Sequence, residues 1–320
     1  MKDKRFDIAA LGELLIDFTQ YGISEAGQRL FEQNPGGAPA NVVCAAARLG
    51  LDTAFIGKVG KDLHGQFLRE VLQKEGVNTD GLVNDGEAFT TMAFVSLDEK
   101  GERNFSFARK PGADTLLRQD ELKDEIVCEC RILNVGSLSM TDEPARTATL
   151  EAVRRAKLSG ASIAYDPNYR KSLWENEAGA IKEMRRLLQV ADYIKLSEDE
   201  MELLTGQHQP EPALKLLLKG EARAAVITLG EQGAVFAAEN YIGRLSAYPC
   251  KVVDSTGAGD AFWGAFLSRM SRVKKVGFEE VCKAVNFANA AASICVSRRG
   301  AIPAMPSLEE VEHIYLENKK

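Results

Sequence analysis

Residues 254–266 read DSTGAGDAFWGAF, and this stretch predicts a glycine-rich loop that leads directly into an apolar helix. Gly257 and Gly259 let the backbone turn sharply and approach a ligand closely. The amides of Gly257, Ala258 and Gly259 are expected to be free at the helix start, where the helix dipole favours an anion. Asp260 follows on the first turn, where a carboxylate can accept the proton of a hydroxyl that attacks a phosphoryl group.

Two alternatives to an anion site fit parts of this loop. A plain helix N-cap is the first, since aspartate and serine are common there and glycine is common in turns. A dinucleotide site is the second, but the run that begins at Gly257 lacks the third glycine of that motif and comes late in the chain, which disfavours NAD. The sequence also has no G-x-x-x-x-G-K-[ST] motif, so a P-loop is excluded.

Outward from this loop, short apolar runs alternate with helical patterns, which is typical of an α/β fold with a mainly parallel sheet. Strands are expected at 6–11, 53–56, 132–135, 162–165, 193–196, 225–229 and 234–237. Helices are expected at 41–49, 66–75, 144–158, 181–189, 198–204, 213–219, 258–271 and 279–293.

Two stretches depart from this alternation of strands and helices. Residues 19–34 are polar and have no helical period, and residues 89–108 read as a hairpin with a turn at 98–101. We expect a small β lid over a cleft, built discontinuously from about 12–34 and 89–110. An edge hairpin of the main sheet is the alternative. One side of this hairpin is apolar, through Met92, Phe94, Val95, Phe105 and Phe107.

Polar residues follow four of the predicted parallel strands. Ligands of such sheets bind beyond the carboxyl ends of the strands, so these residues are expected to share one cleft. They are Glu13 and Asp17; Asp166, Asn168 and Arg170; Lys195, Ser197, Glu198 and Glu200; and the run 230–233.

An early glycine-rich motif, NPGGAPAN at 34–41, leads into a helix of small residues. Its glycines bring the backbone close to a polyol, and the Asn41 amide offers both a donor and an acceptor to a hydroxyl. A tight loop with Asn41 as a helix-start residue is the alternative.

Composition limits the classes of function. The chain has 320 residues, 40 basic and 46 acidic, for a formal charge of −6. A pI near 5.4 argues against a nucleic-acid partner, and no apolar run of about 18 residues indicates a membrane span. The cysteines sit mostly in apolar segments and the N-terminus lacks the features of a signal peptide, so we expect a cytoplasmic protein.

The early motif, extended to GGAPANVVCAAARLG at 36–50, and the late one at 254–266 resemble the two signatures of the PfkB (ribokinase-like) carbohydrate kinase family. The resemblance covers essentially the whole chain. It implies one ribokinase-like domain over 1–320, a three-layer α/β/α fold with a small β-sheet lid, and ATP-dependent phosphorylation of a sugar by a phosphotransferase. It further implies a homodimer that pairs through the lid.

The resemblance also implies roles for individual residues. Asp260 corresponds to the catalytic base, with Gly257, Ala258 and Gly259 as the anion hole. Sugar contacts are implied at Asp17, Gly36, Gly37, Asn41 and Asn168, and ATP contacts at Lys195, Ser197, Thr228, Gly230, Gly233, Asn286 and Asn289. Magnesium is implied at Glu200 through water, and potassium at Asp254, Ser255 and the carbonyls near Val296, Arg299 and Ala301. Ser197 replaces the asparagine of the family's Asn-x-x-Glu motif, and Ala304 stands where the cation loop often has serine.

The choice of substrate depends on smaller features. GELLIDF, FSFARKPGAD at 105–114, DPNYR and KLSEDE resemble bacterial and plant fructokinases most, which implies formation of fructose 6-phosphate. Arg109 and Arg170 are expected to point into the sugar–phosphate cleft, where arginines bind phosphoryl oxygens or a carboxylate. A carboxylate would indicate a 2-keto-3-deoxygluconate kinase, but there an aromatic residue usually precedes the arginine, and Ala108 does here. Two further alternatives are a solvated hairpin charge for Arg109 and a non-catalytic sugar or nucleotide sensor for the whole chain.

Overall fold

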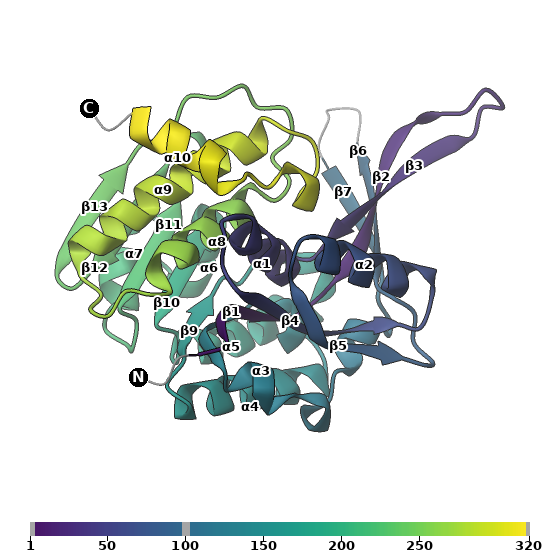
Figure 1. Cartoon of the computed structure of the whole chain (residues 1–320), viewed down its shortest axis with the longest axis horizontal. Coiled ribbons are helices and arrows are strands. Elements are labelled where there is room, and N and C mark those ends of the chain that lie inside the picture. Colours follow the sequence, from purple (N-terminus) through teal and green to yellow (C-terminus); the bar gives the residue numbers. More distant parts are fainter. Residues whose placement is uncertain (1–3, 98–102, 318–320) are drawn as a thin grey trace.

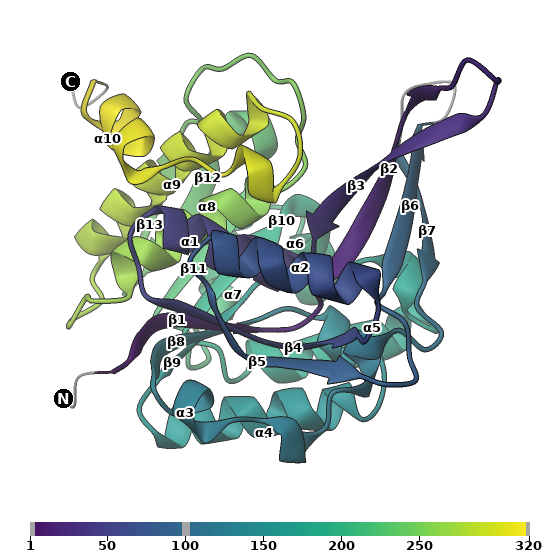
Figure 2. The ribbon, with the colours of Figure 1, turned by 45° about the vertical axis from the view of Figure 1, so that its right-hand side comes forward.

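The computed structural model describes residues 4–97 and 103–317, which form a large α/β body and a smaller β sheet (Figures 1 and 2). The body is built on a nine-stranded sheet in the order β13-β12-β11-β10-β9-β8-β1-β4-β5. Its strands are β1 (Phe6–Leu11), β4 (Thr53–Gly60), β5 (Asn78–Asp85), β8 (Cys130–Val135), β9 (Ser162–Tyr165), β10 (Tyr193–Ser197), β11 (Ala224–Thr228), β12 (Ala234–Ala238) and β13 (Tyr241–Leu245). The seven strands from β11 to β5 in this order pair in parallel with their neighbours. Strand β12 pairs antiparallel with both β11 and β13.

Helices cover both faces of this sheet, which gives the three layers that were expected. One face packs against α1 (Ala38–Arg48), α2 (Leu63–Lys74), α8 (Ala258–Met270), α9 (Phe278–Val296) and α10 (Leu308–Glu317). The other packs against α3 (Asp124–Val127), α4 (Ala145–Leu158), α5 (Glu177–Leu188), α6 (Glu198–Thr205) and α7 (Pro210–Leu217). The central strands are buried on both sides, as nearly continuous apolar runs such as β1, which is interrupted only by Asp7, require.

The second sheet has four strands in the order β3-β2-β6-β7. They are β2 (Leu15–Ile23), β3 (Arg29–Gly36), β6 (Met92–Leu97) and β7 (Arg103–Ala108). Both irregular stretches of the sequence therefore belong to one separate sheet, joined by parallel pairing of β2 and β6, and the edge-hairpin alternative is wrong. The expected turn at 98–101 lies outside the described residues. Figure 2 shows the β2–β3 hairpin projecting beyond the body.

Several helices begin earlier than expected, and the reason lies in their first residues. Helix α1 starts at Ala38 because Pro39 occupies its first turn, where a missing amide hydrogen costs nothing. Asn176 caps α5 by accepting from the Gly179 amide at 2.8 Å. The edge strands β5 and β13 and the terminal helix α10 were not expected.

Within the described residues no helix is both long and apolar enough to cross a bilayer. All six cysteines lie in this part of the chain, and each is a free thiol.

Candidate active site

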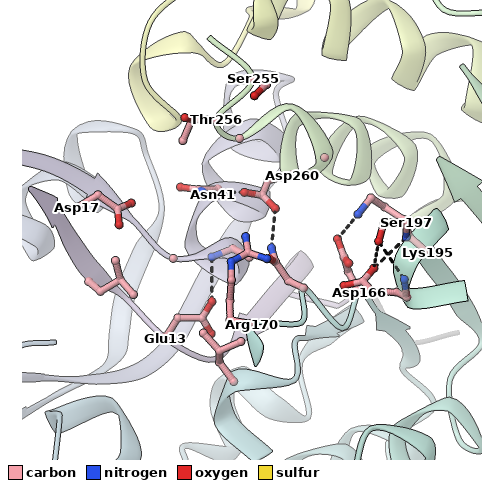
Figure 3. Close-up of a pocket in the computed structure, with 18 of the residues that line it drawn as sticks. Glu13, Asp17, Asn41, Asp166, Arg170, Lys195, Ser197, Ser255, Thr256 and Asp260 are labelled. Carbon is pink, nitrogen blue, oxygen red and sulfur yellow. Dashed lines mark hydrogen bonds and ion pairs between the residues drawn. The ribbon is translucent and has the colours of Figure 1, made fainter. Parts of the chain in front are cut away.

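A cavity of about 340 Å³ opens at the carboxyl edge of the parallel strands, between the body and the small sheet. Side chains from the carboxyl ends of β1, β9, β10 and β11 meet there with the start of α8. Figure 3 shows Asp260 near its centre, with Asn41 and Asp17 to one side and Lys195 to the other. The cavity also receives Leu15 and Phe107 from strands of the small sheet. Glu198 and the run 230–233, which were expected in the same cleft, do not line this cavity, and the run borders a second one.

The glycines at the start of α8 are there because of close packing. Gly257 has φ 76°, and a Cβ on it would come within 2.9 Å of Ala301. A Cβ on Gly259 would lie 3.4 Å from Nζ of Lys195, so an anion at this helix start also meets an ammonium group. The Ala258 amide is not free as expected, because it donates to the Ser255 carbonyl at 3.3 Å.

Asp260 is buried, and two amides hold its carboxylate. Asn41 donates from Nδ2 to Oδ2 at 2.7 Å, and Asn168 donates from Nδ2 to Oδ1 at 3.4 Å. Asn168 can reach this position because it adopts φ 46°, a left-handed conformation that asparagine tolerates. Burial raises the pKa of Asp260, and the hydrogen bond from Asn41 and the charges of Lys195 and Arg170 partly oppose this. The carboxylate is thus held in place and is more basic than an ordinary aspartate.

Lys195, on β10, supplies a buried cation beside the helix start. Its Nζ lies 2.5 Å from Oδ2 of Asp166. Burial by itself would lower the pKa of Lys195, but the charges of Asp166 and Glu200 outweigh this and raise it. Burial raises the pKa of Asp166 to about 6. The ammonium group is therefore charged at neutral pH and fixed next to Gly259.

Glu200 and Ser197 form a capping box at the start of α6. Oε2 of Glu200 accepts from the amide of Ser197 at 2.9 Å and from its hydroxyl at 3.0 Å, and Oε1 accepts from the Tyr169 amide at 2.7 Å. With its oxygens held by protein donors, Glu200 suits contact with magnesium through an ordered water on Oε1 rather than direct ligation.

The expected sugar-contact residues gather at the other end of the cavity, with one exception. Asp17, Gly37 and Asn41 line it, whereas Gly36 does not. A Cβ at Gly36 would lie 2.3 Å from Oδ2 of Asp17. Gly36 therefore leaves room for the Asp17 carboxylate instead of forming the cavity wall.

Arg109 is the main correction to the expected site. It is 6% exposed and is not among the described residues that line the cavity. Its Nε lies 2.8 Å from Oδ2 of Asp114, and Nη2 donates to the Leu138 carbonyl at 2.8 Å. Nη1 donates to the hydroxyl of Thr141 at 3.0 Å. Because the guanidinium is committed to these partners, it holds Leu138 in the cavity wall and does not point into the cleft. Arg170 does line the cavity, as expected.

A second cavity, of about 540 Å³, adjoins the first and shares Thr228, Ser255 and Gly259 with it. Most of the expected ATP-contact residues lie here, including Gly230, Gly233 and Asn289. Asn286 does not line this cavity; its Oδ1 accepts from the hydroxyl of Tyr248, which does line it, at 3.0 Å.

The expected cation-site segments lie together, although one ligand does not fit. Oδ2 of Asp254 accepts from the Gly300 amide at 3.0 Å, which ties it to the loop that carries Arg299 and Ala301. The Val296 carbonyl already accepts from the amides of Val253 and Asp254, at 2.8 and 3.2 Å. Both of its lone pairs are used, so Val296 is not a suitable ligand. The side chain of Arg299 lies 3.6 Å from Glu32 of the small sheet.

Two buried acids of the site follow predicted strands, but their sequence context indicates no role for them. Glu13 and Asp166 both line the main cavity and are nearly inaccessible. Each has one carboxylate oxygen without a hydrogen-bond partner among residues 4–97 and 103–317. Their position after an apolar strand predicted that both would lie in the cleft, but it predicted no role for either carboxylate.

Known proteins resemble this chain along nearly its whole length. The model of the pfkB family of carbohydrate kinases matches residues 5–308. The chain is 39% identical to a probable fructokinase-5 of Arabidopsis thaliana, over 98% of each chain. It is 41% identical to a fructokinase-1 of Zea mays, over 95% of this chain and 96% of that one.

Solved structures give the same picture. A fructokinase with bound ATP from Xylella fastidiosa superposes with a TM-score of 0.91 at 34% identity, covering 98% of this chain and 99% of that one. A fructokinase from Vibrio cholerae O395 in a form with bound fructose, ADP and calcium ion gives a TM-score of 0.88 at 32% identity, covering 96% and 98%.

Proposed function

This chain belongs to the pfkB family of carbohydrate kinases, and we propose that it is an ATP-dependent fructokinase that forms fructose 6-phosphate. One observation carries the proposal. Asp260, the start of α8 and the Lys195 ammonium lie where two adjoining cavities meet, one sized for a sugar and the other for a nucleotide.

The chain's own groups account for in-line phosphoryl transfer. The Asp260 carboxylate accepts the proton of the attacking 6-hydroxyl, while the amides at Gly257 and Gly259 and the Lys195 ammonium stabilise charge on the phosphoryl oxygens. Magnesium bound with ATP neutralises phosphate charge, and Glu200 is placed to contact it through water. The small sheet covers the sugar end and limits the access of water, which protects ATP from hydrolysis.

The lining of the sugar end favours a neutral polyol over a sugar acid. Two buried acceptor atoms at this end have no hydrogen-bond partner among the described residues: Oε2 of Glu13 and Oδ1 of Asn41. Sugar hydroxyls can donate to such acceptors, whereas a carboxylate cannot. The carboxylate of 2-keto-3-deoxygluconate would need a free cation there, and Arg109 is already paired with Asp114. Arg170 lies near Asp260, at the transfer end.

We also propose that the protein is a homodimer that pairs through the small sheet. This sheet carries exposed apolar side chains on β2, β3 and β6: Tyr21, Ile23, Leu30, Phe31 and Phe94. Burying them against a second copy would remove this apolar area from water. The free cysteines agree with a cytoplasmic location, and potassium would be held by Asp254, Ser255 and the carbonyls near Arg299 and Ala301.

A coupled assay of ADP release with magnesium and ATP tests these proposals. Fructose, 2-keto-3-deoxygluconate, ribose, tagatose and adenosine are compared, each with and without potassium. The highest kcat/KM is expected for fructose, with activation by potassium. Preference for the keto acid would overturn the fructose assignment, and lack of turnover on the whole panel would favour the sensor.

A further inference from the structure

Glu13 is a buried acid in the wall of the sugar end that takes no part in the phosphoryl transfer described above. It follows β1, is 3% exposed, and lines the same cavity as Asp17 and Asn41 (Figure 3). Asp260 lies across that cavity, so Glu13 belongs to the part of the site that holds the sugar rather than the phosphates.

The two oxygens of Glu13 have different environments. Oε1 accepts from the Ala38 amide at 3.0 Å, at the first residue of α1. The Ala38 amide is one of the helix-start donors that have no acceptor within the helix, and Gly37, the N-cap residue, has no side chain to cap any of them, so Glu13 caps the start of α1. Oε2 is buried and has no partner in the described part of the chain. A buried acceptor without a donor is unfavourable, and the cavity that Glu13 lines is where a donor can arrive.

The charges around Glu13 leave this oxygen available. Arg109 attracts it, but that guanidinium is bonded to Asp114, whose charge opposes the attraction. Asp17 and Asp260 also line this cavity, and Arg170 is a lining cation whose charge acts on Asp260. Burial raises the pKa of Glu13 to about 7, so near neutrality the carboxyl can accept a hydrogen bond or donate one.

We propose that Glu13 is a sugar-binding residue, in which Oε2 hydrogen-bonds one hydroxyl of the substrate while Oε1 keeps the start of α1 in place. This inference rests on the proposed function and adds a contact that selects a neutral polyol. An acidic substrate that placed its carboxylate here would find a donor only while Glu13 is protonated, whereas a sugar hydroxyl can bond to either form of the carboxyl.

Glu13→Gln is the most informative variant, because its amide keeps an Oε1 acceptor for Ala38 and replaces Oε2 with a donor. We expect KM for fructose to rise about tenfold, the size expected for one altered hydrogen bond to a charged group, with KM for ATP changed less than twofold. Glu13→Ala also loses the cap and should raise KM for fructose further. Glu125→Gln, at an exposed position on α3, is the matched control. An unchanged KM for fructose in Glu13→Gln would overturn the proposal.

Deoxyfructose analogues identify the hydroxyl and separate binding from a purely structural role. For the analogue that lacks the contacted hydroxyl, the ratio of KM between Glu13→Gln and wild type should fall to about one. A ratio that stays the same for every analogue would mean that Glu13 acts only through α1 and would overturn the contact. If wild type phosphorylates another sugar of the panel, the ratio of KM between Glu13→Gln and wild type is measured on deoxy analogues of that sugar. A wrong fructose assignment and a wrong Glu13 contact therefore give different results.

Discussion

The side-chain amide of Asn41 donates a hydrogen bond to the carboxylate of Asp260, with 2.7 Å between Nδ2 and Oδ2. These residues belong to the early and late glycine-rich motifs, so the fold joins the two motifs by a direct contact. Because Nδ2 is used in this way, Oδ1 of Asn41 is left buried and without a partner in the part of the chain that the structure describes. Asn41 can therefore accept from the sugar while it orients the base.

Asp260→Asn should abolish proton acceptance while it preserves the shape of the site. Turnover should fall by roughly 10²–10⁴, the usual contribution of a general base, and ATP should still raise the melting temperature. Steady-state kinetics and a thermal-shift titration measure the two effects. Asp120→Asn, at an exposed position, is the control. Near-normal turnover of Asp260→Asn would show that this carboxylate is not the base.

The pH profile of kcat/KM for fructose should report the raised pKa of Asp260. The base must be deprotonated, so activity rises as pH increases through this pKa, and the acid limb should lie above that of an ordinary aspartate. Asn41→Asp would place a second carboxylate beside Asp260, and the two would share a proton, which moves the limb to higher pH.

Asn41→Ala distinguishes the effect of an added carboxylate from the effect of losing the hydrogen bond to Asp260. It removes a hydrogen bond that lowers the pKa of Asp260 but adds no charge, so its limb should move upward by less than that of Asn41→Asp. An acid limb that stays in place in Asn41→Asp would contradict the arrangement of these two residues.

Local signals explain which parts of the site the sequence could predict. The start of α8 was predictable because the glycines, the helix start and Asp260 lie within a few residues of one another. The direction of Arg109 was not, because it depends on Asp114 and Leu138, which reach it only through the tertiary fold. The same holds for Asn286, which shares a helix with Asn289 but is hydrogen-bonded to the Tyr248 hydroxyl.

The fold was predictable to a similar degree and for a similar reason. Buried strands such as β1 are apolar except for Asp7, so their sequence alone identifies them. The edge strand β5 reads NTDGLVND, which has neither strict alternation nor an apolar run, and its pairing with β4 decides its conformation. Residues 19–34 gave no helical signal, but only their pairing partners place them in a separate sheet.

Arg109→Met should destabilise the fold rather than weaken sugar binding selectively. The substitution leaves Asp114 buried without its cation, and breaking a buried ion pair typically costs about 3–5 kcal/mol. Urea unfolding measures this loss, and a second substitution, Asp114→Leu, should recover part of it. If Arg109→Met had normal stability and only its KM for sugar were raised, the Arg109 side chain would have to point into the cleft.

The proposed dimer depends on the exposed apolar side chains of the small sheet. Phe31 and Phe94 are each 41% exposed, and a charge at either position would be unfavourable in a dimer interface. Phe31→Asp and Phe94→Asp should therefore be monomers by size-exclusion chromatography with light scattering, while wild type is a dimer. Leu158→Asp, on α4, is 76% exposed and should leave the mass unchanged. A monomeric wild type would contradict the proposed assembly.

The titration of Glu13 should appear in the pH dependence of stability. Its pKa is raised from 4.5 to about 7 in the folded chain, so the folded state binds more protons than the unfolded state between these values. Its contribution to the free energy of unfolding is therefore greatest below pH 4.5 and decreases as pH rises to about 7, by up to about 3 kcal/mol. Glu13→Gln does not titrate, so its stability relative to wild type should increase over this interval and level off above it. Unfolding in urea at several pH values measures the difference, and a difference that is constant from pH 4.5 to 8 would show that Glu13 ionises normally in the folded protein.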